Sequence, residues 1–281
     1  MAYLKYKDKS GVWQYVPCLK YKNESDVFQI TRSIKYKDAN GIWQKAHCYD
    51  PKSSNNDDYP TISTLTVGSS VYLNENGTAV EYLLVQNGLP DETLYDSSCD
   101  GMWLLRKDCC DKTTWDSTDN DYENSDIHAY LNGTFLGSFD TDVQKIIKQV
   151  KVPYRKGSGR SNTVTGGADG LLTKVFLPSL RELNVYTVSQ DGSVLDYFIN
   201  ASNTVNAFDD LRVANYQGSA VKWWVRTPYC ETNTYTEKTC VYISEGGTSG
   251  VNNCYLTNHF RPIVILPHTA KLDPNTNIII G

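Results

Sequence analysis

Long hydrophobic runs are missing from this chain of 281 residues. No stretch approaches the roughly 18 apolar residues that a membrane-spanning helix needs, so membrane insertion is not expected. The first residues, Met1 to Tyr6, also lack the apolar core of a signal peptide. We therefore expect synthesis in a cytoplasm. Release by lysis, as for the parts of a virion, stays open.

Histidine is scarce, and the common motifs of catalysis and metal binding are absent. None of the four histidines has a second one at a metal-binding spacing, and no C-x-x-C pair exists. There is no G-x-S-x-G elbow, and the glycine-rich stretches 157–160 and 166–170 lack the Lys-Ser/Thr end of a phosphate-binding loop. No dense Lys/Arg cluster is interleaved with aromatic residues, which argues against nucleic-acid binding. We expect no catalytic residue, no metal and no cofactor.

One acidic stretch, residues 116–126, is a possible exception to the absence of metal sites. Its carboxylates are hard oxygen ligands of the kind that calcium prefers. They belong to Asp116, Asp119, Asp121, Glu123 and Asp126. The stretch lacks the central glycine and distal glutamate of an EF-hand loop. We interpret it as a solvated loop, with calcium binding as the alternative.

Eight cysteines are spread along the chain: Cys18, Cys48, Cys99, Cys109, Cys110, Cys230, Cys240 and Cys254. Without a signal peptide, free buried thiols are the expected state. Disulfides that form after release are the alternative. Cys230, Cys240 and Cys254 are then the best candidates, because they share the loop-rich end of the chain.

The first fifty residues contain a repeat with a constant offset of thirty residues. Lys-Tyr-Lys-Asp at 5–8 recurs at 35–38. Gly11, Trp13, Gln14 and Cys18 recur as Gly41, Trp43, Gln44 and Cys48. Each copy reads as strand, glycine turn and strand, which predicts a duplicated β-hairpin with little core of its own.

The charge of the chain is divided between this repeat and the rest. Residues 1–50 hold nine basic and five acidic residues, a balance of +4, and the whole chain has a net charge of −5, which leaves −9 elsewhere. A basic module on an acidic body suits docking to an acidic partner, and two modules of different origin are the alternative. The hairpin repeat itself indicates attachment to other virion or surface proteins, or homo-oligomerisation. Stabilising decoration is the alternative. Residues 51–60 are polar and bounded by prolines, so we read them as a linker to a main domain over 61–281.

The main domain opens with strand signals and continues with helix signals. Residues 70–73 and 80–85 flank a turn at Asn74–Gly77, and Met102–Arg106 reads as a third strand. Ser125 fits as the cap of a short helix that ends at Gly133. Capping-box patterns at 141–144 and 179–182 predict two more short helices. This order predicts an α+β fold with a mainly antiparallel sheet and two or more short helices.

Two adjacent tryptophans mark the strand around which the main domain is organised. Trp223 and Trp224 must point to opposite faces of a strand that Pro228 ends. One of them can fill the core while the other packs elsewhere or lies on the surface. A second strand follows at 240–244, then a glycine turn, and the chain returns through 255–266.

Four motifs carry a resemblance to a known family. They are Ile127–Phe135 (I-H-A-Y-L-N-G-T-F), Val175–Glu182 (V-F-L-P-S-L-R-E), Trp223–Pro228 (W-W-V-R-T-P) and Phe260–Ile263 (F-R-P-I). In this order they resemble an uncharacterised domain family of bacteria and phages with a W-W-L-R-S-P … R-P-A signature. The resemblance implies a C-type-lectin-like fold, a group that includes phage receptor-binding proteins and formylglycine-generating enzymes.

The resemblance brings no catalytic residues with it. The calcium-dependent sugar-binding motifs Glu-Pro-Asn, Gln-Pro-Asp and Trp-Asn-Asp are absent. Cys230, Cys240 and Cys254 invite comparison with formylglycine-generating enzymes, but nothing else matches that active site.

The last seventy residues are rich in tyrosine, asparagine and threonine, the composition of a binding surface. Their location and composition resemble the varied positions of lectin-fold phage proteins diversified by retroelements. The predicted ligand contacts are Tyr229, Thr232, Asn233, Tyr235, Asn252, Asn253, Tyr255, Asn258 and His259. We expect one exposed face, with Trp223–Arg226 and Arg261–Leu266 as neighbouring strands beneath it. Ordinary polar loops are the alternative.

These observations favour a non-enzymatic binding protein of a phage tail or a bacterial surface. It would display a face for a host-surface protein or a glycan on a C-type-lectin-like scaffold. A structural virion or oligomerisation component without a ligand is the first alternative. An enzyme of the formylglycine-generating type is the second.

Overall fold

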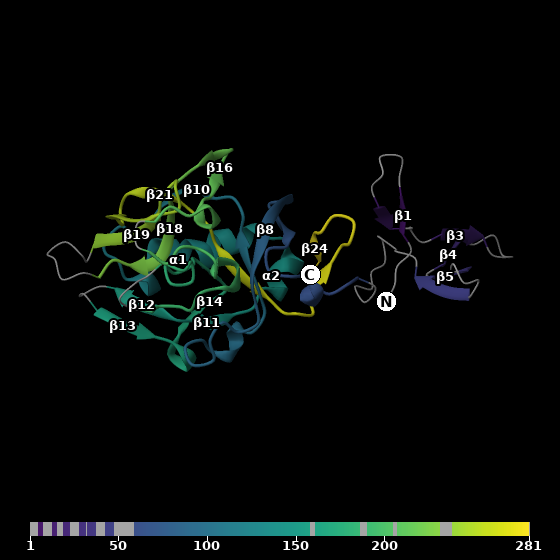
Figure 1. The fold of residues 1–281 in the computed structure, drawn as a ribbon, viewed down its shortest axis with the longest axis horizontal. Coiled ribbons are helices and arrows are strands. Elements are labelled where there is room, and N and C mark those ends of the chain that lie inside the picture. Colours follow the sequence, from purple (N-terminus) through teal and green to yellow (C-terminus); the bar gives the residue numbers. More distant parts are fainter. Residues whose placement is uncertain are drawn as a thin grey trace. The chain divides into compact units, whose positions relative to one another are not determined.

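A computed structural model describes residues 59–157, 161–185, 190–204, 207–230 and 238–280, together with the backbone of six short strands in the first fifty residues. Within it the chain divides into two compact units. One contains Met1–Pro60 with Lys271–Ile280, and the other contains Thr61–Ala270 (Figure 1). The predicted main domain included 271–280. In the structure Leu272 donates its backbone N–H to Pro60 at 2.9 Å, and β23 (Lys271–Leu272) pairs with β24 (Ile279–Ile280).

Three antiparallel hairpins form the described part of the first fifty residues. They are β1 (Lys5–Lys7) with β2 (Trp13–Tyr15), β3 (Leu19–Lys22) with β4 (Phe28–Thr31), and β5 (Ser33–Lys37) with β6 (Trp43–His47). The first and third hairpins are the two copies of the repeat. Lys7 lies opposite Trp13 in one, and Lys37 lies opposite Trp43 in the other. The two copies therefore pair in the same register.

The larger unit is of the α+β class, with mostly antiparallel sheets and a few short helices. Its first five-stranded sheet is entirely antiparallel. In spatial order its strands are β15 (Val175–Phe176), β22 (Ile263–Leu266), β9 (Met102–Arg106), β8 (Thr78–Asn87) and β7 (Ser70–Glu75). Asn76 and Gly77 connect β7 to β8 with φ values of 50° and 75°. Two consecutive positive φ values are typical of the tight hairpin turn that Asn-Gly predicts.

The second five-stranded sheet contains one parallel pair, β18 beside β21. In spatial order its strands are β10 (Cys110–Thr114), β21 (Thr257–Phe260), β18 (Trp223–Pro228), β19 (Thr239–Ile243) and β20 (Ser249–Asn253). The expectation that Arg261–Leu266 would lie beside Trp223–Arg226 is wrong. The chain leaves this sheet at Arg261–Pro262 and enters the other sheet as β22, so β21 is the neighbour of β18.

Smaller ladders and single turns complete the unit. The ladders are β11 (Val150–Val152) with β14 (Leu171–Thr173), β12 (Tyr154–Gly157) with β13 (Ser161–Thr165), and β16 (Asn215–Tyr216) with β17 (Ser219–Ala220). Apart from η6, described below, the 3₁₀ turns in the described residues are η2 (Ile62–Thr64), η3 (Ser97–Cys99), η4 (Tyr122–Asn124), η7 (Gly167–Asp169), η8 (Asp196–Phe198) and η9 (Asp210–Arg212).

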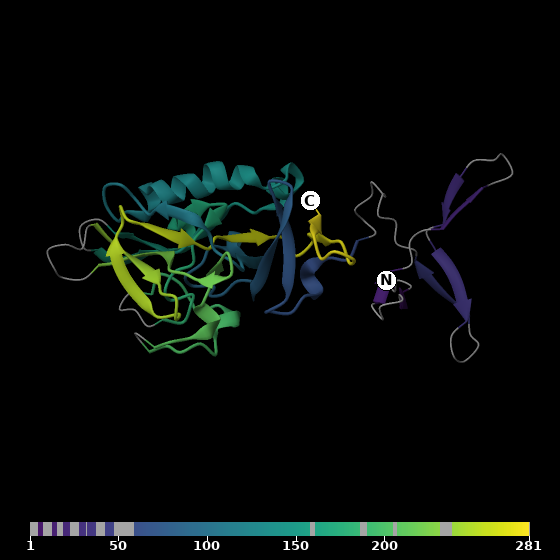
Figure 2. The same cartoon turned by 90° about the horizontal axis from the view of Figure 1, so that it is seen from above.

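A continuous helical run lies along one side of the unit (Figure 2). It consists of α1 (Asp126–Tyr130), a π-helical turn η5 (Leu131–Phe135) and a 3₁₀ turn η6 (Leu136–Ser138), and α2 (Thr141–Ile146) follows. Ser125 caps α1 as predicted, since its hydroxyl accepts from the His128 N–H at 3.3 Å. Gly133 does not end the helix, because no left-handed residue interrupts the run there. Among the described residues no helix is long and apolar enough to cross a membrane.

The two predicted capping boxes behave differently from the prediction. At 179–182 both hydrogen bonds of the box form, from Ser179 N–H to Glu182 Oε2 at 2.9 Å and from Glu182 N–H to Ser179 Oγ at 3.2 Å. The residues that follow make turns rather than a helix, and Asn184 has a φ of 57°. At 141–144 no side-chain cap forms, because Gln144 donates to the carbonyl of Phe139 instead.

Both tryptophans of β18 are fully buried, so neither lies on the surface. Each indole N–H has a carbonyl partner: Trp223 donates to Arg212 at 3.1 Å, and Trp224 donates to Thr113 at 3.0 Å. Two faces of one strand can bury aromatic rings only when both faces are covered by the protein. β18 is therefore a central strand of the core on both of its sides.

Several residues of the family motifs join separate parts of this core. Arg226 binds Glu182 through two N–O contacts of 2.6 Å, which joins the W-W-V-R-T-P and V-F-L-P-S-L-R-E motifs. Asn132 accepts from the backbone N–H groups of Lys174 and Val175 at 2.9 and 3.1 Å. Arg261 is buried, with its guanidinium 5.1 Å from the ring centroid of Trp223. These motifs hold the framework together.

Candidate ligand-binding site

The structure divides the predicted ligand face. Thr232, Asn233 and Tyr235 lie outside the described residues. Asn253 and Tyr255 are exposed and contact each other through a 3.0 Å hydrogen bond, whereas Tyr229 and Asn252 are half-buried.

Asn258 does not belong to an exposed face, so that prediction is wrong for it, and the predicted ligand contact His259 is buried as well. Their exposed fractions are 7% and 5%. They lie on β21, an inner strand of its sheet that is flanked by β10 and β18. His259 Nδ1 lies 2.7 Å from the carbonyl oxygen of Cys110, and the His259 ring packs 4.4 Å from Tyr216.

The exposed residues that remain form the end of the β19–β20 hairpin and the turn after it. Three large apolar side chains there keep about half of their surface exposed: Val251 at 48%, Tyr255 at 51% and Leu256 at 42%. Two backbone hydrogen bonds hold this segment: Leu256 N–H donates to the carbonyl of Asn253, and the carbonyl of Cys254 accepts from Trp115 N–H. These residues lie at the open end of the hairpin, opposite its 244–248 turn, and we call them the 251–256 segment.

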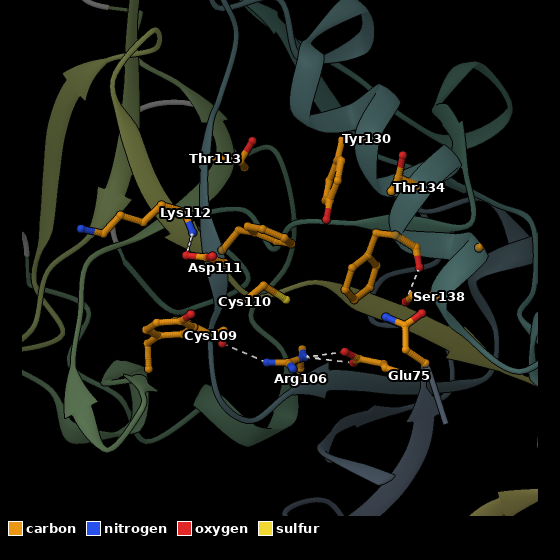
Figure 3. Close-up of a pocket in the computed structure, with 15 residues that line it drawn as sticks. Glu75, Arg106, Cys109, Cys110, Asp111, Lys112, Thr113, Tyr130, Thr134 and Ser138 are labelled. Carbon is orange, nitrogen blue, oxygen red and sulfur yellow. Dashed lines mark hydrogen bonds and ion pairs between the residues drawn. The ribbon is translucent and has the colours of Figure 1, made fainter. Parts of the chain in front are cut away.

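A pocket of about 650 Å³ opens elsewhere, between β10 and the helical run α1–η6 (Figure 3). The residues that line it on the two facing elements include small ones, among them Thr113 on the strand and Thr134 and Gly137 on the helical run. A β-carbon added at Gly137 would meet nothing within 4 Å, so the space there is open. The pocket exists because these short side chains do not fill the gap between strand and helix.

Aromatic rings form the apolar walls of this pocket. Tyr130 packs edge-to-face on Phe260 at 5.8 Å, and Phe135 packs edge-to-face on the same ring at 6.0 Å. Tyr216, from the β16–β17 hairpin, adds another ring. Tyr130 is 38% exposed, so part of its surface is open to a ligand. These side chains come from segments far apart in the sequence.

One end of the pocket is an ion pair. Arg106 Nε lies 2.9 and 3.3 Å from the two carboxylate oxygens of Glu75 (Figure 3), and the Tyr82 hydroxyl donates to Glu75 Oε1 at 2.6 Å. Strand ends bring the groups together, because Glu75 ends β7 and Arg106 ends β9. Arg106 Nη1 also donates to the carbonyls of Asp108 and Cys109 at 2.6 and 2.9 Å.

The titratable groups of the pocket carry balanced charge. Two acidic and two basic residues line it: Glu75, Asp111, Arg106 and Lys112. Burial raises the pKa of the Cys109 thiol to about 12 and holds the pKa of Cys110 well above its usual range. Burial also raises the pKa of Tyr130. At neutral pH both thiols and the phenol are therefore protonated and uncharged.

The acidic stretch 116–126 is partly structural. The Asp116 carboxylate accepts from the N–H groups of Thr118, Asp119 and Asp126 at 2.6, 2.9 and 3.0 Å, so it organises its own loop. Within the described ranges no group of three or more His, Cys, Asp or Glu side chains could hold a metal ion.

Comparison with known protein families gives one match. Residues 100–268, more than half of the chain, match the family described as Domain of unknown function (DUF6273). The chain belongs to this family. It matches no curated protein and no solved structure.

The DUF6273 region runs from the start of β9 to just beyond β22. It contains Arg106, Tyr130 and Phe260 of the pocket, but Glu75 and the β7–β8 hairpin lie before it. The ion pair at the end of the pocket thus joins a residue of the DUF6273 region to one outside it.

Sequence reasoning missed the pocket. Tyr130 lies within the quoted Ile127–Phe135 motif, but nothing in that motif pairs it with Phe260. A usable signal was the charged residue that ends each strand: Glu75 after the alternating pattern of β7, and Arg106 after the apolar run of β9.

Proposed function

We propose that this DUF6273 protein is a non-enzymatic binding protein, and that the pocket between β10 and the α1–η6 run holds an uncharged saccharide. The observation that carries the proposal is the combination of aromatic walls with a charge-balanced lining. Binding pockets are typically apolar with a few convergent polar groups that fix the orientation of the ligand.

The chemistry of a saccharide fits both parts of the lining. The C–H faces of a sugar ring pack on aromatic rings, whose faces are electron-rich. Its hydroxyls require donors and acceptors, which Asn76, Thr113 and Thr134 supply. The lining contains two acidic and two basic residues, so a charged ligand would meet no net opposite charge there.

The raised pKa values of the two cysteines in the pocket favour binding over catalysis. A nucleophilic cysteine needs a lowered pKa, whereas the pKa of Cys109 and that of Cys110 are both raised by burial. Glu75 accepts from both Arg106 and Tyr82, so its carboxylate is engaged in the structure of the pocket. A reaction of the formylglycine-generating type would need a reactive thiol in such a cleft.

We further propose a C-type-lectin-like scaffold displayed on a phage tail or a bacterial surface, attached through residues 1–50 or assembled there as a homo-oligomer. Two things support this setting: the four motifs quoted above, and the hairpin repeat with its identical register in both copies. The 251–256 segment is the rival ligand site, because it exposes Val251, Tyr255 and Leu256.

A matched pair of tyrosine variants tests which site binds. Tyr130→Ala removes a ring from the pocket wall, and Tyr255→Ala removes the exposed ring of the 251–256 segment. Both side chains are partly exposed, so folding is retained. An array of neutral bacterial surface and cell-wall glycans identifies a ligand for the unmodified protein, and titration calorimetry then measures its affinity. We expect Tyr130→Ala to weaken binding about tenfold or more, equal to about 1.4 kcal/mol, with Tyr255→Ala unchanged.

Three results would replace this proposal. A loss of affinity confined to Tyr255→Ala would place the binding site at the 251–256 segment. Affinity that falls steeply with added salt would mean that the ligand is charged. No binding to glycans or host cells by the folded protein would favour the structural role.

A further inference from the structure

Two buried cysteines meet at the base of the β19–β20 hairpin. Cys240 lies on β19, opposite Asn252, and Cys254 follows the last residue of β20. Cys254 N–H donates to the Lys238 carbonyl at 2.8 Å, which holds it diagonally across from Cys240. The thiols are in hydrogen-bond contact, and the exposed fractions are 0% for Cys240 and 1% for Cys254.

Their place in the fold gives a small reagent a route to Cys254. Within the part of the chain that the structure describes, β20 is the edge strand of its sheet, with no strand on its outer side. Cys254 lies between Asn253 and Tyr255, both exposed. Edge hairpins and turns open locally at lower free energy than central strands do. A brief opening of the 251–256 segment would therefore uncover Cys254 while the core strand β18 stays in place.

We propose that Cys240 and Cys254 form a thiol–disulfide redox site, oxidised to a cystine by a small-molecule disulfide such as oxidised glutathione. The Cys254 thiolate attacks one sulfur of the reagent, and the first glutathione leaves as a thiolate. Cys240, after losing its proton, attacks the Cys254 sulfur of the mixed disulfide and releases the second glutathione. The two cysteine protons end on the two glutathione thiols, so the cysteines are oxidised and the reagent is reduced.

The local electrostatics assign the two roles. The hydrogen bond from Cys240 lowers the pKa of Cys254, against the effect of its burial. Burial and the neighbouring Cys254 hold the pKa of Cys240 well above its usual range. The thiolate is the nucleophile in disulfide exchange, so Cys254 attacks first and Cys240 resolves the mixed disulfide.

A cystine here would close a ring around the hairpin. The ring would restrict residues 240–254 and, next to it, the exposed Tyr255. The carbonyl of Cys254 already accepts from Trp115 and Asp116 at 2.9 and 3.1 Å, so the ring would also fix the junction with the residues after β10. Such a link stabilises chiefly by restricting the unfolded chain.

The test uses the full chain in buffers of reduced and oxidised glutathione. With oxidised glutathione we expect the intact mass to fall by two hydrogen atoms and peptide mapping to link Cys240 to Cys254. The melting temperature should rise, and dithiothreitol should reverse both changes. Cys99→Ser, which removes a buried thiol outside this hairpin, is the control and should behave as the unmodified protein does.

Single variants test the order of the two steps. Cys240→Ser should retain a glutathione on Cys254, because the resolving thiol is missing, and Cys254→Ser should retain none on Cys240. A cystine that maps to another pair would overturn the proposal. So would a native protein in which both thiols stay reduced in oxidised glutathione, as alkylation after denaturation would show, while the denatured chain oxidises. These two outcomes are read on the unmodified chain, so they hold even when a variant does not fold.

Discussion

The guanidinium of Arg226 uses all five of its N–H groups inside the protein. Two go to the carboxylate of Glu182, and the others go to the carbonyls of Pro153, Leu177 and Asp191 at 3.1, 2.8 and 3.0 Å. Such complete use leaves no donor for a ligand. Arg226 is therefore a structural residue, although a charged residue in a recurring motif would suggest a site.

Replacing Glu182 with glutamine is expected to cost about 3–5 kcal/mol in the free energy of unfolding. The change removes the negative charge and leaves Arg226 charged and fully buried. Chemical denaturation measures the loss. Asp142→Asn is the matched control, because it removes the same charge from an exposed pair with Lys145 and should cost less than about 1 kcal/mol. Equal effects of the two changes would contradict this account.

His128 gives the protein a dependence on mildly acidic pH. Its Nδ1 lies 3.1 Å from the carbonyl oxygen of Glu123 and must donate to it, while its buried Nε2 has no partner. A second proton would place an N–H with no acceptor there. Burial accordingly lowers the pKa of His128 below its ordinary value of 6.5.

The sign of this dependence follows from which state binds the proton. Below pH 6.5 the unfolded chain takes up the proton and the folded chain resists it, so stability falls as the pH is lowered through 6.5. Above that pH the contribution is fully present. Melting temperatures measured between about pH 7.5 and 5 should decline in the native chain and decline less in His128→Gln. Parallel profiles for the two proteins would show that His128 is not responsible.

At the scale of elements, two glycine turns look alike in sequence but differ in packing. Gly77 joins β7 to β8 with a φ of 75°, and a β-carbon there would meet nothing within 4 Å. Gly247 lies in the turn between β19 and β20 with a φ of 77°, and its β-carbon would overlap the backbone of Asp209. Both turns need a left-handed residue, but only one is packed against another segment.

Alanine at these two glycines separates backbone strain from close packing. Gly77→Ala should cost about 1–2 kcal/mol, the strain of an L-residue in the left-handed region. Gly247→Ala should cost clearly more, because it also displaces Asp209, whose carboxylate accepts from Leu211 N–H at 3.0 Å. Denaturant unfolding of both variants gives the difference. Equal costs would mean that the 209–212 segment adjusts freely.

At the scale of the whole molecule, the unit Thr61–Ala270 contains a large set of fully buried apolar side chains, from Ile62 to Leu266. That unit therefore has a core of its own. A chain of residues 59–280 should melt cooperatively at nearly the temperature of the same unit in the full chain, and it should keep its saccharide affinity.

Circular dichroism and calorimetry of the two chains make this comparison. The shortened chain retains Pro60, which accepts from Leu272, so the last strands keep that contact. Non-cooperative melting of residues 59–280 would show that the first fifty residues complete the core.

The sequence by itself determined the features that depend on near neighbours. Strands at Met102–Arg106 and Trp223–Pro228 follow from runs of β-forming residues, and the Asn76–Gly77 turn follows from residues that accept positive φ. The Ser125 cap and the register of the two repeat copies are local in the same sense.

Only the tertiary structure decided which segments meet. The parallel pairing of β18 with β21 buried Asn258 and His259, although the loop-like composition around Asn258 predicted its exposure. The pocket required Glu75, Arg106, Tyr130 and Phe260 to converge from four separate elements. Strand order and helix placement are set by the packing of distant side chains, and composition and local spacing do not encode that packing.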